Sequence, residues 1–228
     1  MKQLALGVRL RAGAVFDSFA PGQNAEAIDA LRRSSVLPIW LWGLSGCGKT
    51  HLLQAVCAAA VDNAAYFPLD RALALPPEAL LGFAAKSVLC LDDVDAVAGD
   101  RAWETALFRV FNEAAELGTR IVFAAREAPR QIAWCLEDWQ SRAAACVVYQ
   151  LRELDEIGRV EAMQKRAAQR GLQLPAETID YLLKRVPRDL KSLFDVLDEL
   201  DEASLVAQRR LTIPFIRDAI EKRVKTRS

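Results

Sequence analysis

The segment that most constrains this chain is Gly43-Leu44-Ser45-Gly46-Cys47-Gly48-Lys49-Thr50, which matches the pattern GxxxxGK[ST] in full. An apolar strand candidate, Ile39–Trp42, comes directly before it, and a helical pattern, Lys49–Ala60, opens within it. That order is the context in which the pattern forms a phosphate-binding loop. Glycines let backbone N–H groups turn toward a phosphate, and the helix N-terminus adds partial positive charge. The sequence therefore predicts a nucleotide site.

Residues of this loop carry separate predictions. We expect Lys49 to reach the β- and γ-phosphate oxygens and the Thr50 hydroxyl to bind Mg²⁺, so the expected cofactors are ADP or ATP with Mg²⁺. His51 follows inside the helix; it is included as a nucleotide candidate, although a lone histidine there is more often a plain helix-face residue. The predicted nucleotide contacts of this stretch are Gly43, Gly46, Cys47, Gly48, Lys49, Thr50 and His51.

Two acidic residues, Asp92 and Asp93, follow the strand candidate Ser87–Leu91. Asp92 is expected to hold Mg²⁺ through water, and Asp93 stands where many ATPases place the acid that polarises the attacking water. By themselves, two aspartates after a strand are more often a turn or a helix cap. Because a complete phosphate loop precedes them, we prefer the Mg²⁺ interpretation.

Short apolar runs alternate with helical patterns between residues 14 and 151. The strand candidates are Ile39–Trp42, Ala65–Pro68, Ser87–Leu91, Arg120–Ala125 and Cys146–Leu151. Apolar strands that alternate with helices predict a five-stranded parallel sheet covered on both faces. After about residue 152 only helical periodicity continues, at Asp155–Arg170, Ala176–Val186, Arg188–Gln208 and from Pro214. We therefore predict an N-terminal tail over 1–12, an α/β base domain over 13–152 and a small all-helical lid over 153–228.

Composition argues against several classes of function. Lys+Arg 30 and Asp+Glu 30 give a formal net charge of zero. Proteins that neutralise many phosphates usually carry a basic surplus, so direct sequence-specific DNA binding is not expected. The five cysteines show no CxxC spacing, which indicates reduced and mostly buried thiols. We find no signal peptide and no apolar run long enough for a membrane span, and therefore expect a cytoplasmic protein.

An α/β base followed by a helical lid is the plan of AAA+ proteins, and the chain resembles their DnaA branch. The loop and its extension through His51-Leu52-Leu53-Gln54-Ala55 carry this resemblance. So does Phe16-Asp17-Ser18-Phe19 with Gly22, where the family lays the adenine against the chain, and Phe19 is therefore a further nucleotide candidate. Within the branch, the chain is similar to the Hda family of DnaA-related regulators, which inactivate DnaA after replication has begun. The matching segments are Ala98–Asp100, Ala128–Gln131, Leu136–Arg142, Asp198–Ser204 and Ala207–Phe215.

This resemblance implies DnaA and the β sliding clamp as partners. Gln3-Leu4-Ala5-Leu6 is similar to the short peptide that docks into the clamp's hydrophobic pocket, so Gln3, Leu4 and Leu6 are the expected contacts; an unstructured start with two leucines is the alternative. Arg142 occupies the place of the family's arginine finger, which acts in trans, and a surface salt bridge is the alternative. Arg188 occupies the place of the sensor 2 arginine, which contacts bound nucleotide; otherwise it is a helix-start arginine.

One departure concerns hydrolysis by the chain itself. The family usually places a polar or acidic sensor 1 residue where Ala124-Ala125-Arg126 stands, and Arg126 inverts the expected charge. We therefore expect weak intrinsic ATPase activity, with ADP held as a structural ligand. The resulting hypothesis is a regulator that binds the clamp and promotes hydrolysis of DnaA-bound ATP.

A different class of protein remains open as well. The alternative is an autonomous AAA+ ATPase, such as a DnaC-type helicase loader, that uses Asp93 to turn over its own ATP. The chain as given ends at Ser228, before the helix-turn-helix domain that DnaA carries, which again disfavours a DNA-binding initiator. AAA+ domains commonly pair base to lid, so a homo-oligomer is compatible with either hypothesis.

Overall fold

The computed structural model describes residues 13–33, 36–60, 63–172, 174–187, 189–207 and 216–217. The chain divides into two compact units, Met1–Glu153 and Leu154–Ser228, which we call the base and the lid.

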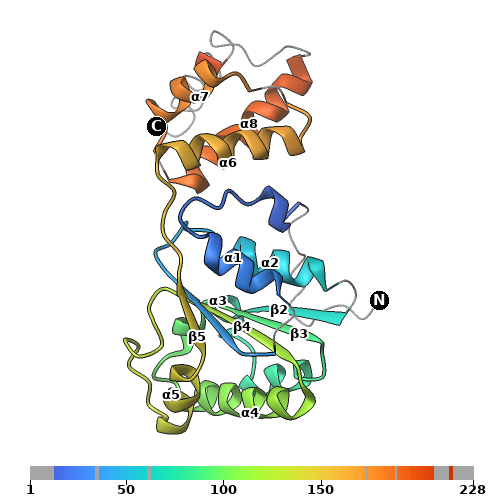
Figure 1. Cartoon of the computed structure of the whole chain (residues 1–228), viewed down its shortest axis with the longest axis vertical. Coiled ribbons are helices and arrows are strands. Elements are labelled where there is room, and N and C mark those ends of the chain that lie inside the picture. Colours follow the sequence, from blue (N-terminus) through green and yellow to red (C-terminus); the bar gives the residue numbers. More distant parts are fainter. Residues whose placement is uncertain are drawn as a thin grey trace. The chain divides into compact units, whose positions relative to one another are not determined.

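The described part of the base contains five strands that form one parallel sheet in the order β2-β3-β4-β1-β5 (Figure 1). The strands are β1 (Ile39–Trp42), β2 (Ala64–Pro68), β3 (Val88–Asp92), β4 (Arg120–Ala125) and β5 (Val147–Gln150). Each prediction for a strand is confirmed to within one residue at either end. Parallel neighbours need crossover connections, and here helices supply them.

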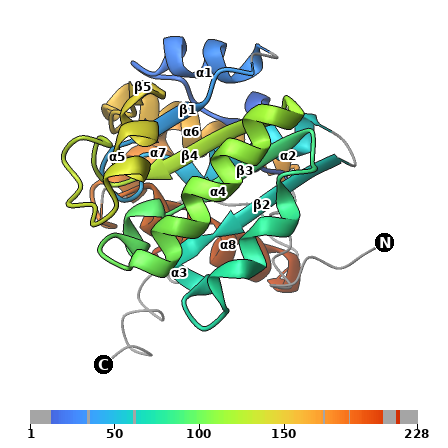
Figure 2. The ribbon, with the colours of Figure 1, turned by 90° about the horizontal axis from the view of Figure 1, so that it is seen from below.

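The helices of the base cover both faces of this sheet, with α1 and α2 on one side and α4 along the other (Figures 1 and 2). Their bounds are α1 (Ala25–Arg32), α2 (Lys49–Ala59), α3 (Leu69–Ala72), α4 (Arg101–Leu117) and α5 (Glu137–Ala144), with short 3₁₀ turns η1 (Phe16–Ser18), η3 (Pro77–Phe83) and η4 (Val94–Val97). Helices α1 and α5 were not among the predicted segments, because both are short and α5 is largely polar.

Successive side chains along a strand enter two different apolar clusters. On β1, Trp40 joins the cluster on the α4 side, together with Phe123 of β4 and Leu107 of α4. The next residue, Leu41, joins the cluster on the α2 side, together with Leu52 of that helix. This alternation follows from the two-residue period of a strand, and it explains why the strands are apolar throughout.

Helix α4 has well-defined ends. The Asp100 carboxylate accepts hydrogen bonds from the N–H groups of Ala102 and Trp103, at 2.9 and 3.2 Å, and so caps the first turn. Gly118 ends the helix with a φ of 69°, a conformation that glycine adopts without steric cost. Both ends of α4 are therefore fixed by local backbone interactions.

The lid contains α6 (Glu156–Gln169), α7 (Ala176–Leu183) and α8 (Leu190–Ala207). A separate apolar cluster, which includes Met163, Ile179 and Leu197, joins the three helices. Arg166 of α6 and Arg170, the C-cap residue of that helix, also bind α8: both contact the Asp198 carboxylate, at 3.0 and 2.8 Å. In the described part of the lid, the prediction of helices without strands is confirmed.

A pair of leucines on α4 tests whether the α4 cluster stabilises the base. Leu107 is fully buried and Leu117 is 57% exposed. We expect Leu107→Ala to lower the free energy of unfolding by about 2–5 kcal/mol, because it leaves a cavity in the core. Leu117→Ala, with the same change in helix propensity, should stay within about 0.5 kcal/mol of the original protein. Urea unfolding measures both, and equal losses would contradict the packing described.

Candidate functional site

The loop between β1 and α2 is shaped by glycines at close contacts. Gly48 has a φ of 99°, and a Cβ added there would lie 2.5 Å from the Phe19 ring. A Cβ on Gly43 would overlap the carbonyl oxygen of Leu151. Side chains are therefore excluded at both ends of the loop, and its backbone N–H groups stay close to the start of α2.

Lys49 is the buried cation of this loop, with 7% of the residue exposed. Its Nζ donates to the carbonyl oxygens of Gly43 and Leu44, at 2.7 and 3.0 Å, and lies 3.8 Å from the Cys47 sulfur. These partners are neutral, and an anionic phosphate oxygen is a stronger acceptor for an ammonium group. The loop thus holds its positive charge where a phosphate would compensate it.

Asp92 lies at the carboxyl end of β3 and is 1% exposed. Its carboxylate accepts a hydrogen bond from the Tyr66 hydroxyl at 2.7 Å and from the Asp93 N–H at 3.1 Å. Burial raises the pKa of Asp92, whereas hydrogen bonds from Thr50, Tyr66 and the Asp93 N–H, together with the charge of Lys49, oppose that rise. Strand β3 therefore brings Asp92 to Thr50 at the start of α2.

The pair formed by Thr50 and Asp92 suits a hard cation. Mg²⁺ prefers hydroxyl, carboxylate and water oxygens, and in nucleotide sites it binds one or two protein oxygens together with phosphates. The residues present therefore fit a nucleotide phosphate with Mg²⁺. Among the described residues, no group of three or more His, Cys, Asp or Glu side chains forms a separate metal site.

Asp93 has unusual backbone and charge properties. Its φ of 52° is left-handed, which costs a non-glycine residue about 1 kcal/mol or more. Burial, followed by the nearby charges of Asp92, Asp70 and Asp95, raises the pKa of Asp93 to about 6. A carboxyl with such a pKa accepts a proton near neutral pH more readily than an ordinary aspartate.

The end of β4 holds an ion pair in place of the polar residue that the family resemblance implied. Ala124 and Ala125 are fully buried. Arg126 Nε donates to the Asp95 carboxylate at 2.8 Å, and its backbone N–H donates to the same group at 3.2 Å. Asp95 therefore neutralises the positive charge of Arg126 at the carboxyl end of β4.

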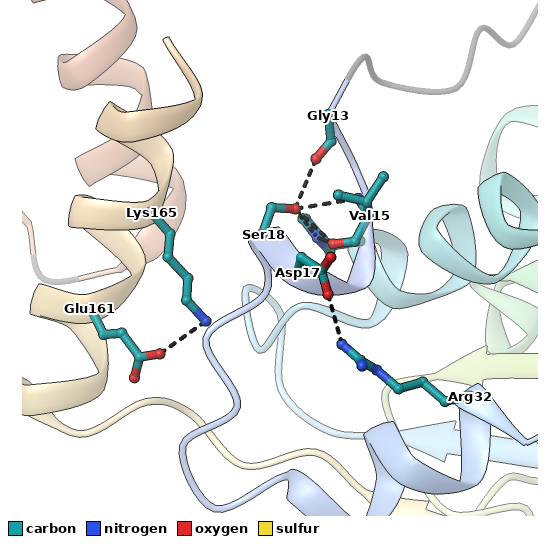
Figure 3. Close-up of polar contacts among 8 residues, drawn as sticks. Gly13, Val15, Asp17, Ser18, Arg32, Glu161 and Lys165 are labelled. Atoms are coloured by element: carbon teal, nitrogen blue, oxygen red, sulfur yellow. Dashed lines mark hydrogen bonds and ion pairs between the residues drawn. The ribbon is translucent and has the colours of Figure 1, made fainter. Parts of the chain in front are cut away.

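The segment before α1 is held against the first turns of α2. The Ser18 hydroxyl oxygen lies 2.8 Å from the Gly13 carbonyl and 2.7 Å from that of Val15 (Figure 3). His51 Nε2 lies 3.0 Å from the same Val15 carbonyl and 3.1 Å from the Ser18 hydroxyl oxygen. The His51 ring is 5.5 Å from that of buried Phe19. Both predicted nucleotide candidates thus lie together beside the loop.

Arg142 lies on α5, away from these groups. Trp139 and Ala143 of the same helix are fully buried, whereas Arg142 is exposed. Its guanidinium carbon is 6.0 Å from the centre of the Phe108 ring on α4. Within the described ranges its guanidinium forms no hydrogen bond or ion pair.

The remaining candidates lie outside the described residues: Arg188, Gln3, Leu4 and Leu6. The neighbouring Asp189 carboxylate accepts the Ser192 N–H at 2.8 Å, at the first turn of α8.

Tyr66 and Glu104 are two buried polar residues that sequence reasoning missed. Tyr66, which binds Asp92, is the only hydroxyl-bearing residue of β2, but its strand position did not show which way the hydroxyl points. Glu104 is 0% exposed although it is charged. Its spacing from Leu107 places it on the apolar side of α4, and that position was the available signal.

Replacing Lys49 tests the phosphate loop directly. We expect Lys49→Ala to weaken ADP binding about tenfold to a hundredfold, since a charge-assisted hydrogen bond to a phosphate is lost. Calorimetric titration with ADP and Mg²⁺ measures this affinity. Lys86→Ala, next to the opposite end of β3, is the matched control and should bind ADP normally. An unchanged affinity of the Lys49 variant would show that this loop is not the site.

Comparison with known proteins relates the two units to characterised folds. Residues 146–220 match the family described as "Hda, lid domain". Domain III of the replication initiation protein DnaA from Thermotoga maritima is 22% identical, with a TM-score of 0.79 over 94% of this chain and 98% of that chain. AMPPCP-bound DnaA from Aquifex aeolicus is 24% identical, with a TM-score of 0.70 over 84% of this chain and 66% of that chain.

A more distant structure shares the same architecture. The RuvB Holliday junction branch migration motor of Thermotoga maritima is 14% identical, with a TM-score of 0.63 over 85% of this chain and 64% of that chain. Among the described residues, no helix combines the length and apolar character needed to cross a membrane. The chain thus shares the fold of DnaA domain III, and its residues 146–220 are similar to the Hda lid domain.

Proposed function

We propose that this protein regulates the initiation of DNA replication by promoting the hydrolysis of ATP bound to DnaA, while ADP occupies its own phosphate loop. A tether to the β sliding clamp, through Gln3, Leu4 and Leu6, would bring it to newly replicated DNA. The observation that carries the proposal is the position of Arg142, an exposed arginine on a helix whose inner face is fully buried.

Arg142 has the properties that an arginine finger needs. An arginine supplied in trans stabilises the charge on a transferring γ-phosphate, and its planar guanidinium can bind two oxygens at once. Its guanidinium has no carboxylate partner in the described part of the chain, so binding a phosphate breaks no ion pair there. Contact with the Phe108 ring at 6.0 Å limits the directions that the side chain samples.

The chain's own site supports nucleotide binding with slow turnover. Lys49, Thr50 and Asp92 meet at the loop, and the DnaA of Aquifex aeolicus, with a similar fold, is AMPPCP-bound. At the end of β4, however, Ala124 and Ala125 are apolar and Arg126 is paired with Asp95, so the strand end lacks the polar or acidic sensor 1 residue that would orient an attacking water. This supports ADP as a resident ligand, with Arg188 as its proposed sensor 2 contact.

One observation favours a second candidate, an autonomous ATPase of the helicase-loader type. Asp93 has its pKa raised to about 6 and stands where such enzymes keep their water-polarising acid. The two candidates differ in a single measurement. Turnover of ATP in the absence of both DnaA and clamp supports the autonomous enzyme, whereas hydrolysis that requires DnaA and DNA-loaded clamp supports the regulator.

The central prediction concerns Arg142. We expect Arg142→Ala to lower the maximal rate of DnaA-stimulated hydrolysis by about a hundredfold or more, because transition-state charge loses its partner. Arg142→Lys should recover little activity, since an ammonium group cannot reproduce the bidentate geometry. The measurement is phosphate release from ATP-bound DnaA in the presence of DNA-loaded clamp.

Two controls accompany this variant. Arg109→Ala removes another exposed arginine, on neighbouring α4, and should leave the stimulation unchanged. Thermal unfolding should be alike for all variants, because the Arg142 side chain is exposed. A variant that melts normally and still stimulates at the original rate would rule out the finger.

The clamp tether is tested by replacing Gln3, Leu4 and Leu6 together with alanine. We expect clamp binding to fall below detection, because the two leucines would supply the buried apolar area. Surface plasmon resonance on immobilised clamp measures the affinity, and ADP binding serves as the control for an intact base. Retained clamp affinity would move the contact to another part of the chain.

A further inference from the structure

The buried carboxylate of Glu104, on the first turn of α4, binds two separate segments of the chain: the turn at Gly99 and the residues just before α5. One oxygen accepts from the Gly99 N–H at 2.7 Å, and the other accepts from the Leu136 N–H at 2.7 Å. The Cys135 N–H lies 3.1 and 2.9 Å from the two oxygens. A carboxylate that is 0% exposed is thus satisfied by three backbone donors.

The Gly99 and Leu136 donors belong to two different structural elements. Gly99 belongs to the turn that follows η4, the 3₁₀ turn after Asp92 and Asp93. Leu136 is the N-cap residue of α5, and its own side chain supplies no cap. Glu104 therefore accepts the N–H groups of the N-cap residue and of Cys135, the residue before it, and so binds the chain where it enters α5.

Helix α5 has only eight residues, so its orientation depends on few contacts. Trp139 and Ala143 fix the buried face of the helix against the core. Packing alone leaves a two-turn helix free to rotate and slide slightly about that face. The Glu104 bonds to the N-cap residue Leu136 and to Cys135 before it restrict both movements. Arg142 lies one helical turn beyond Trp139, so any such movement carries its guanidinium with it.

We infer that Glu104 is the positioning residue for Arg142: its carboxylate fixes the start of α5, and thereby the direction in which Arg142 meets ATP bound to a partner subunit. This rests on the proposed function of Arg142. A buried carboxylate costs free energy unless it is hydrogen-bonded, and three backbone donors supply those bonds here. An apolar residue at this position would leave the three donors without an acceptor.

Hydrogen exchange tests the anchoring without any partner. In the unmodified protein, the amides of Gly99, Cys135 and Leu136 should exchange as slowly as those inside α4. Glu104→Gln keeps the size of the side chain but turns a donor toward backbone donors, and should speed exchange across residues 135–144 by about tenfold or more. Glu113→Gln makes the same change at an exposed position of α4 and should have no effect. Fast exchange of the three amides in the unmodified protein would overturn the inference, whatever the variant does.

A kinetic measurement separates positioning from general stability. Glu104→Gln should lower the maximal rate of partner hydrolysis at least tenfold, while the concentration for half-maximal stimulation and the ADP affinity stay unchanged. In the double variant Glu104→Gln/Arg142→Ala, the rate should be no lower than with Arg142→Ala alone, because both act through one guanidinium. A loosened α5 with full stimulation, or independent losses that multiply, would overturn the inference while the function of Arg142 stands. Full stimulation by Arg142→Ala itself would instead refute the proposed function.

Discussion

The sheet of the base unit is buried on both faces, and its functional geometry depends on that burial. Strands β3 and β4 pass between two apolar clusters, so their backbones are fixed against movement toward either face. Parallel strands bring their carboxyl ends to one edge, and Asp92, Asp93 and Arg126 all stand there. The same edge receives the phosphate loop from β1. Burial of the sheet thus holds the backbone that carries these polar groups in a fixed position.

Buried charges in this protein are each compensated in a different way. Lys49 is held by neutral carbonyls of its own loop, which favours exchange for a phosphate oxygen. Asp92 is held by a tyrosine hydroxyl and an N–H, with Lys49 nearby, and remains beside Thr50 for a cation. Glu104 is satisfied by three backbone N–H groups. Lys49 and Asp92 are thus arranged to bind a ligand, whereas Glu104 is arranged to hold other parts of the chain in place.

Arg126 and Arg142 differ in whether a carboxylate of the same chain binds their guanidinium group. Arg126 is bound to Asp95 through its backbone and its side chain, so its charge is used within the subunit. Arg142 contacts only the face of an aromatic ring through its side chain, as far as the described residues show. An unpaired guanidinium binds an external anion without first losing an ion pair. The difference supports a partner-directed role for Arg142 and a structural role for Arg126.

The sequence by itself determined the strand, loop and helix around Gly43–Thr50, the acidic end of β3 and the order of strands and helices, because these depend on local spacing and on continuous apolar runs. Every strand lies within one residue of its predicted bounds. Helices α1 and α5 were not predicted, since two turns with two or three buried residues give little periodic signal. Only the tertiary structure showed that Tyr66 binds Asp92, that Asp95 pairs with Arg126 and that Glu104 holds the start of α5. Those contacts join residues 26 to 32 positions apart, and packing of whole elements, not local spacing, decides which distant polar groups meet.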